Sequence, residues 1–340
     1  MSQPITFAQA LTQGHFKRYL LLGNGFSTAL FGDIFSYKSL KDEADFSKHP
    51  NLLQAFERIG TPDFERVIRA LEYSAIVGDI YQVPSAKTEK IRKDTEVLKE
   101  ILISTIANRH PENATKVLDD AKNACNIFLS HFNKIYTLNY DVLLYWTLLH
   151  GRKQRVEDID DGFRLPDDDF GADYRVFDSP HSPTFFFLHG GLHLFDSGSE
   201  TRKYVWIDTQ KQIISQVREA IGKNLYPLFV AEGSSDQKMT KINHSGYLSK
   251  ALRSFESVCD VKDADLFIFG HSLNETDEHI LSRIRKGKIS RIFVSVFKDR
   301  ETGYDRAFIR KASALGVDRS KRYPLEVVLY DAESAKVWSN

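Results

Sequence analysis

The sequence predicts an α/β fold built on a Rossmann-like, doubly wound and mostly parallel sheet. Short apolar runs recur along the chain, and each ends in a turn that is polar or contains glycine. Such runs are typical of strands buried on both faces of a parallel sheet. Helical patterns separate several of the runs, as at residues 307–314. This alternation favours a sheet that carries helices on both faces.

The apolar runs are the candidate strands. The first, at residues 19–22, runs directly into Gly23. Runs of the same form lie at residues 135–138, 185–188, 266–269, 292–296 and 327–330. Ligands of open α/β sheets bind outside the carboxyl ends of the strands. The turns that follow these runs are therefore where we expect a site.

We expect one domain over residues 1–340, with a helical insertion over residues 50–132. Amphipathic stripes fill this insertion, and Thr61 with Pro62 has the pattern of an N-cap followed by the first helical residue. Its helices could supply an interface, although such stripes usually face a core. Residues 155–183 are acidic and rich in Asp, Gly and Pro, and we expect a long irregular loop there.

Composition restricts the class of partner. The 46 Lys and Arg residues balance 46 Asp and Glu residues, which argues against direct binding to nucleic acid or to an anionic membrane. The first residues lack the pattern of a signal peptide, and no apolar run approaches the roughly 18 residues of a membrane span. We expect a soluble, cytoplasmic protein. The 2 cysteines, Cys125 and Cys259, cannot build a four-thiolate zinc site.

The turn after the first run is Gly23-Asn24-Gly25-Phe26-Ser27. Its glycines would let the backbone come close to a ligand, and a following helix would point its N-terminal amides at a phosphate. The same pattern also occurs as a plain tight turn in α/β proteins. The residues alone leave both interpretations open.

The turn at residues 137–141 brings Asn139 and Asp141 to the end of the next run. Both residue types are favoured helix N-caps, and for Asp141 capping is the simpler interpretation. The opposite hypothesis is that these side chains face a ligand at the strand end.

His189 follows the aromatic run at residues 185–187 and is the candidate general base, because histidine has the unperturbed pKa nearest neutrality. A structural role is the alternative. His193 lies four residues further on, but the two intervening glycines disfavour a helix and no Glu follows His189 as in a zinc motif. We therefore expect no metal.

The last turn of interest begins with Gly270-His271-Ser272 and includes Asn274. Its glycine and hydroxyl suit a second close approach of backbone to a ligand. Asp277 lies just beyond it and could instead be a first-turn carboxylate that the helix dipole favours.

Taken in order, these turns resemble motifs of the sirtuin superfamily, and more closely those of bacterial sirtuin-like NAD hydrolases of antiphage defence. The turn at residues 23–27 is similar to the GAG-x-S phosphate turn, with Asn24 in place of Ala. Residues 137–141 are similar to the TQNxD motif, with Leu138 in place of Gln. His189-Gly190 corresponds to the catalytic His-Gly pair, and residues 270–272 to the Gly-x-Ser turn on the adenosine half of the cofactor.

The resemblance implies a pocket that takes NAD as substrate, with Asn139, His189 and Asp141 as the catalytic group. It implies cofactor binding by residues of the first and last turns: Gly23, Asn24, Gly25, Phe26, Ser27, Gly270, His271, Ser272, Asn274 and Asp277. Without a four-cysteine zinc module, the expected acceptor is water rather than an acyl-lysine. The expected activity is cleavage of NAD to nicotinamide and ADP-ribose. In antiphage defence, this cleavage would act by depleting NAD.

Two other functions stay open beside NAD hydrolysis. The same pocket could sense NAD or ADP-ribose without cleaving it and act through a partner protein, and protein deacylation is disfavoured by the missing zinc module. A toxic hydrolase must be restrained, which implies a homo-oligomer, a partner subunit or a second ligand. Glu232 and Lys238 lie in a stretch that is similar to defence-associated members, and they could form a salt-bridged lid or only fix a loop. We favour the loop.

Overall fold

The structure is a computed structural model of the chain. It describes residues 3–153, 160–166, 172, 174–178, 183–197, 200–204, 212–223, 225–230, 235–299, 303–317, 319 and 321–339. Glu232, and much of the acidic stretch over 155–183, lie outside these residues.

A 6-stranded sheet, parallel throughout, forms the centre of the molecule, with the strand order β12-β9-β8-β1-β2-β5. This confirms the predicted α/β class, and every predicted apolar run supplies one strand. The strands are β1 (Arg18–Leu22), β2 (Lys134–Thr137), β5 (Phe185–Phe187), β8 (Asp265–Phe269), β9 (Arg291–Val296) and β12 (Glu326–Asp331).

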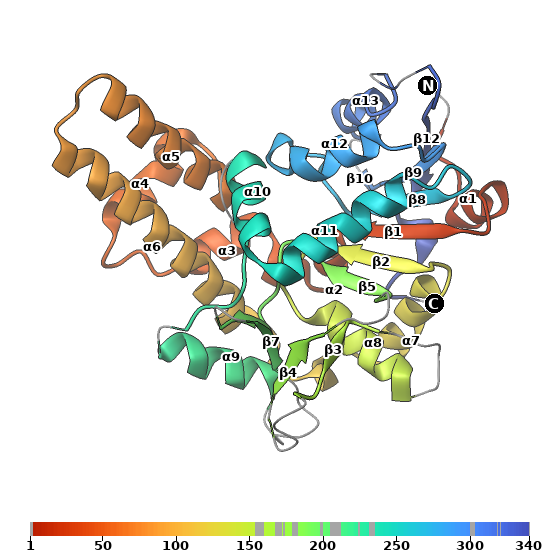
Figure 1. The fold of residues 1–340 in the computed structure, drawn as a ribbon, viewed down its shortest axis with the longest axis horizontal. Coiled ribbons are helices and arrows are strands. Elements are labelled where there is room, and N and C mark those ends of the chain that lie inside the picture. Colours follow the sequence, from red (N-terminus) through yellow and green to blue (C-terminus); the bar gives the residue numbers. More distant parts are fainter. Residues whose placement is uncertain are drawn as a thin grey trace.

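Helices pack on both faces of this sheet. Phe255 of α11 (Gly246–Cys259) lies with its ring 5.1 Å from that of Tyr136 in β2. Phe128 of α7 (Asp119–Leu129) lies 5.6 Å from Phe269 in β8. Tyr136 and Phe269 pair with consecutive residues of β1, so they point to opposite faces. The sheet is therefore doubly wound, and Figure 1 shows α11 crossing one of its faces.

Further helices complete the layers around the sheet and its connections. They are α1 (Phe7–Gln13), α2 (Gly25–Phe35), α3 (Tyr37–Glu43), α8 (Leu143–Lys153), α9 (Ile213–Gly222), α10 (Ser235–His244), α12 (Glu278–Lys286) and α13 (Arg306–Ala314). Short 3₁₀ turns η1 (Ala114–Lys116), η2 (Glu275–Asp277) and η3 (Glu333–Ala335) join some of them. Within the described part of the chain, no helix has both the length and the apolarity to cross a membrane.

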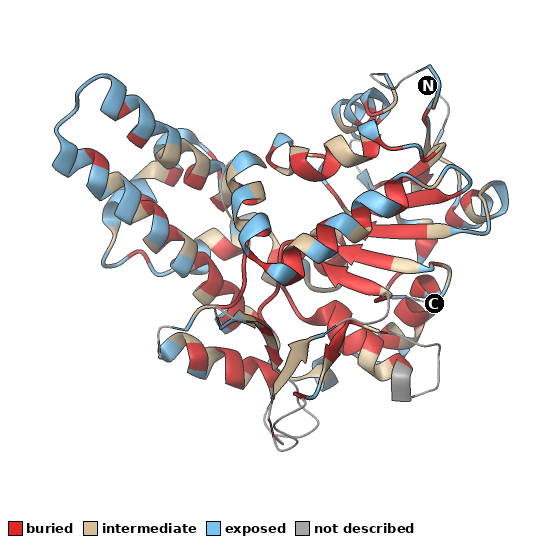
Figure 2. Ribbon diagram, in the orientation of Figure 1, coloured by how far each residue is buried: buried red, intermediate tan, exposed pale blue. Residues whose placement is uncertain are grey.

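A lobe of three helices, α4 (Pro50–Ile59), α5 (Phe64–Ile80) and α6 (Ser85–Arg109), projects to the side of the sheet (Figure 1). Its far end carries mostly exposed residues (Figure 2). The predicted start of α5 is wrong by two residues, because Asp63 is the N-cap and accepts from the amides of Glu65 and Arg66. The stripe at residues 119–129 belongs to α7, which packs on the sheet rather than on this lobe.

A second sheet of 4 antiparallel strands lies beside the first, in the order β3-β4-β7-β6. Its strands are β3 (Phe163–Arg164), β4 (Tyr174–Phe177), β6 (Leu194–Asp196) and β7 (Thr201–Tyr204), and a 2-stranded hairpin joins β10 (Lys298–Asp299) to β11 (Gly303–Tyr304). The prediction of an irregular loop over 155–183 is therefore wrong for the residues of β3 and β4. The local composition could not indicate β4, because this strand pairs with β7, more than twenty residues further along the chain.

Candidate functional site

A cleft of about 1190 Å³ opens at the carboxyl ends of the parallel strands. The turns after β1, β2, β5 and β8 all contribute to its lining, which is the convergence expected for an open α/β sheet. From the predicted site, the residues that line it are Gly23, Asn24, Gly25, Asn139, Asp141, His189, Gly270, His271, Ser272 and Asp277. Phe26, Ser27 and Asn274 are not among the lining residues.

The two glycine turns pack against each other. The amide of Gly25 donates to the carbonyl of Gly270 at 2.7 Å. A Cβ on Gly25 would lie 2.5 Å from the Cα of Gly270, and a Cβ on Gly23 would lie 2.6 Å from the Cα of His271. Gly270 itself has a φ of +67°, which favours glycine. The contact between the turns after β1 and β8 therefore explains these glycines without any ligand.

Two of the three predicted residues that miss the cleft have structural roles. Phe26 is buried and lies 4.7 Å from the ring of Trp338. Ser27 is also buried and bonds to side chains of the neighbouring turn. Asn274 precedes η2, and its side chain makes no capping hydrogen bond there.

Ser27 joins Asn139 to Asp141. The Asn139 amide nitrogen donates to Oγ of Ser27 at 2.8 Å, and Ser27 in turn donates to Oδ2 of Asp141. Oδ1 of Asp141 accepts from the amide of Leu143 at 2.9 Å. Burial raises the pKa of Asp141, and these bonds oppose the rise. Asp141 thus holds the turn in shape, while Oδ1 of Asn139 has no hydrogen bond to a described residue.

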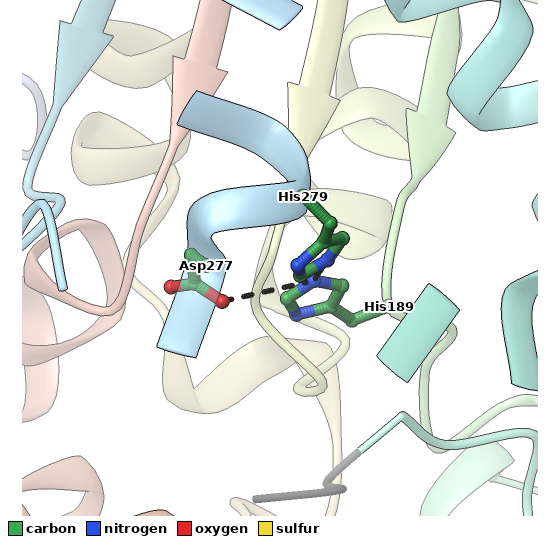
Figure 3. A group of neighbouring side chains, drawn as sticks. All are labelled: His189, Asp277 and His279. Atoms are coloured by element: carbon green, nitrogen blue, oxygen red, sulfur yellow. Dashed lines mark hydrogen bonds and ion pairs between the residues drawn. The ribbon is translucent and has the colours of Figure 1, made fainter. Parts of the chain in front are cut away.

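His189 meets a second buried histidine. Its Nε2 lies 2.9 Å from Nε2 of His279, at the start of α12, and 3.9 Å from Oδ1 of Asp277. Figure 3 shows the two rings side by side and the Asp277 carboxylate directed toward them. Burial holds the pKa of His189 well below its usual range, with the charge of Lys238 as a smaller cause. Burial also lowers the pKa of His279, to about 3, so both rings are neutral at physiological pH.

Behind this pair lies an ammonium group that is fully buried. Nζ of Lys238 in α10 is 2.8 Å from Oε2 of Glu65 and 2.9 Å from Oδ1 of Asp277. Its side chain has 0% exposure. Lys238 lies in a helix, and its two bonds pair α5 of the helical lobe with the residue just before α12.

The two carboxyl groups that bond to Lys238 differ in their pKa shifts. Burial raises the pKa of Glu65, and Lys238 opposes that rise. Although burial acts the other way, the charge of Lys238 holds the pKa of Asp277 well below its usual range. Asp277 is thus the ionised carboxylate of the cluster, and the pKa of Lys238 is raised because its two carboxyl partners outweigh burial.

His271 is held in one tautomer. The amide of Leu273 donates to its Nδ1 at 2.8 Å, so in the neutral ring Nε2 carries the hydrogen. That Nε2 lies 3.1 Å from Oδ2 of Asp277 and donates to it. His271 therefore fixes the second oxygen of the Asp277 carboxylate rather than facing a ligand with a free nitrogen.

Within the described part of the chain, His189, Asp277 and His279 have the geometry of a possible metal site, because one ligand atom of each lies within 4.8 Å of the others. Oδ1 of Asp277, however, already accepts from the Lys238 ammonium, and the 2.9 Å between the imidazoles is a hydrogen-bond distance. The three residues therefore form a hydrogen-bonded cluster. His193 is not one of them, and its ring instead lies 4.8 Å from that of Tyr145.

Sequence reasoning missed Glu65 and His279. Glu65 lies in the helical lobe, far along the chain from the strand-end turns, and His279 falls inside a helical pattern. A signal was present in the second case, because Asp277 and His279 stand two residues apart directly after a strand-end turn. Such a pair at that place points to the cleft.

These features define a class: a doubly wound α/β protein with a strand-end cleft and a buried acid-base cluster on its wall. The chain belongs to the family described as "Domain of unknown function (DUF4917)", whose model matches residues 20–338. A comparison with curated proteins gives no match.

Proposed function

We propose that the cleft binds NAD+ and hydrolyses it to nicotinamide and ADP-ribose. One observation carries the proposal: Asn139 and His189, from the turns after the adjacent strands β2 and β5, line the same cleft as the glycine turns after β1 and β8. The volume of about 1190 Å³ is ample for a dinucleotide. A site that only holds a nucleotide has no need of a buried neutral imidazole.

The chemistry asks little of the protein at the leaving group. The nicotinamide ring of NAD+ is cationic and departs neutral, so no general acid is needed. The protein must orient the ribose, stabilise positive charge at its C1′ atom and supply an activated water. His189 is neutral because burial lowers its pKa, so it has an unprotonated nitrogen, and we assign it the role of accepting the proton of that water.

Asn139 and Asp141 have different roles in this proposal. Nδ2 of Asn139 is used by Ser27, so its carbonyl Oδ1 is the atom left to accept from the water or a ribose hydroxyl. Asp141 acts through Ser27 as a positioning residue. The bonds of Asp141 to Ser27 and to the amide of Leu143 favour support of the Asn139 turn over contact with the nicotinamide carboxamide.

A sensor of NAD+ or ADP-ribose that acts through a partner is the second candidate, and a specific contact favours it. Glu65, in α5 of the helical lobe, bonds to Lys238, which bonds to Asp277 in the cleft wall. Occupancy of the cleft could bias the position of the lobe through this chain of bonds.

The cellular context follows from the sequence resemblance alone. We place the reaction in the cytoplasm, as NAD+ depletion in antiphage defence, restrained by a homo-oligomer or a partner protein. Neither a zinc ion nor another cofactor has a step in this mechanism.

Product analysis separates the two candidates. The purified chain is incubated with NAD+, nicotinamide and ADP-ribose are measured by chromatography, and binding is measured by calorimetry. Both products in equal amounts support hydrolysis. Binding of NAD+ without products, with and without a candidate partner, supports the sensor instead.

A further inference from the structure

The contact between His189 and His279 holds a single proton. Both rings are neutral, and their Nε2 atoms lie 2.9 Å apart, so one ring must donate and the other accept. Nε2 of His189 is thereby engaged, which leaves Nδ1 as the nitrogen available to a ligand in the cleft. For His189 to act as a base at Nδ1, its hydrogen must reside on Nε2 and point at His279.

No neighbour among the described residues fixes the tautomer of His279. Its Nδ1 is buried and makes no hydrogen bond to any residue that the structure describes. His271 offers the contrast within the same cluster, because the Leu273 amide on its Nδ1 keeps the hydrogen on Nε2. Nε2 of His279 can therefore accept the hydrogen bond from Nε2–H of His189, with the hydrogen of His279 on its Nδ1.

Burial disfavours a positive charge on either ring, but the neighbouring charges act differently on the two. At His189 the charge of Lys238 outweighs that of the Asp277 carboxylate, whose Oδ1 lies 3.9 Å from Nε2. At His279 the Asp277 carboxylate favours the charged form more strongly than Lys238, Arg283 or His271 each disfavours it. Of the two rings, His279 is therefore the better place for an extra proton.

We propose that His189 and His279 form a proton relay, with His279 as a second catalytic residue of the hydrolysis proposed above, on which this inference rests. An O–H bond of the water breaks as Nδ1 of His189 takes the proton, and the Nε2 proton of His189 passes to Nε2 of His279. The water oxygen bonds to C1′ of the ribose, and the C1′–N electron pair leaves with neutral nicotinamide. The extra proton is then on His279 and returns to solvent after product release.

Replacement of His279 by Gln tests the relay. The Gln side chain can keep a hydrogen bond to Nε2 of His189, but it cannot take a proton. We expect the Kd for NAD+ to change by less than about threefold and kcat to fall by about 100-fold or more. His244→Gln is the matched control, because that histidine is exposed and bonds to the carbonyl of Thr240. Its kcat stays at the wild-type value.

Mixtures of H₂O and D₂O provide a readout that a structural role would not move. Two protons in flight make kcat a curved function of the deuterium fraction in the wild type, and the remaining single transfer makes it linear in His279→Gln. A linear dependence in the wild type, or wild-type kcat in His279→Gln, overturns the relay.

Nitrogen-15 NMR of the histidines keeps the relay testable even if the chain does not cleave NAD+. The relay predicts a protonated Nε2 in His189 and an unprotonated Nε2 in His279, while His271 shows a fixed Nε2–H. A hydrogen on Nδ1 of His189 would contradict the relay, and so would one tightly bound Zn²⁺ that His279→Gln abolishes. The predicted tautomers without products from NAD+ would support the relay and overturn the proposed reaction.

Discussion

Lys238 and Asp277 form a buried ion pair at 2.9 Å that joins α10 to the wall of the cleft. Oε2 of Glu65 accepts a second hydrogen bond from the same ammonium, at 2.8 Å. Because the Lys238 side chain is fully buried, the cluster depends on all of its partners being present.

Lys238→Met removes the only ammonium of this cluster and leaves Glu65 and Asp277 buried together. Loss of one partner of a buried pair costs about 3–5 kcal/mol. We expect a loss of that order in the free energy of unfolding, measured by urea titration at pH 7. The control is Arg92→Met, which removes a pair with Asp79 whose side chains are 45% and 49% exposed. Equal stability of Lys238→Met and the wild type would show that the ion pair is not formed.

His110 makes the protein sensitive to acid. Its Nε2 accepts from the amide of Val142, next to Asp141, and its Nδ1 faces the carbonyl of Pro111, so the ring must be neutral. Burial lowers its pKa to about 4. The folded state therefore binds this proton less readily than the unfolded state, and stability present above pH 6.5 is lost as pH falls toward 4.

His110→Gln keeps an acceptor at the position of Nε2 without a titrating group. We expect the decline in the free energy of unfolding between pH 6.5 and 4 to be smaller than in the wild type, by up to about 3 kcal/mol. Urea titrations at several pH values measure it. The same slope in both proteins would assign the sensitivity to other buried histidines.

Gly25→Ala tests the contact between the turns after β1 and β8. The new Cβ would lie 2.5 Å from the Cα of Gly270, so backbone must move. We expect a loss of about 1–3 kcal/mol in the free energy of unfolding, together with weaker nucleotide binding. Gly246→Ala is the matched control, because no atom lies within 4 Å of a Cβ built there. If both variants behave alike, the turns do not interlock.

Ser27→Ala separates positioning from direct contact with substrate. Ser27 does not line the cleft, but it bonds to Asn139 and Asp141. Its loss leaves the buried Asp141 carboxyl short of a donor, at a cost of about 1–3 kcal/mol. We expect kcat for NAD+ cleavage to fall more than the affinity for NAD+. Steady-state kinetics and calorimetry measure the two, and a change in affinity alone would refute the positioning role.

The sequence predicted the sheet and the strand-end turns that contribute to the cleft, for a physical reason. A parallel strand buried on both faces is a local apolar run, and its turn comes next in the chain, so Gly23, Asn139, His189 and Gly270 could be found one run at a time. Their convergence in one cleft then follows from the sheet.

Features that depend on contacts far apart in sequence could not be found in this way. Glu65 reaches Lys238 across 173 positions, and the strand β4 depends on β7. The pattern of glycines was identified, but the sequence left its cause open: Gly23 and Gly25 pack against the turn after β8. The sequence of a single turn does not indicate which distant segment packs against it.

The central claim is that His189 and Asn139 act on NAD+ within this cleft, and the turnover of two alanine variants tests it most directly. Nicotinamide release is measured for the wild type, His189→Ala, Asn139→Ala and the control His244→Gln, with ADP-ribose affinity measured in parallel. The account predicts losses of about 100- to 10,000-fold in kcat for the two site variants, and wild-type turnover for the control. Near-normal turnover in either site variant would contradict the account.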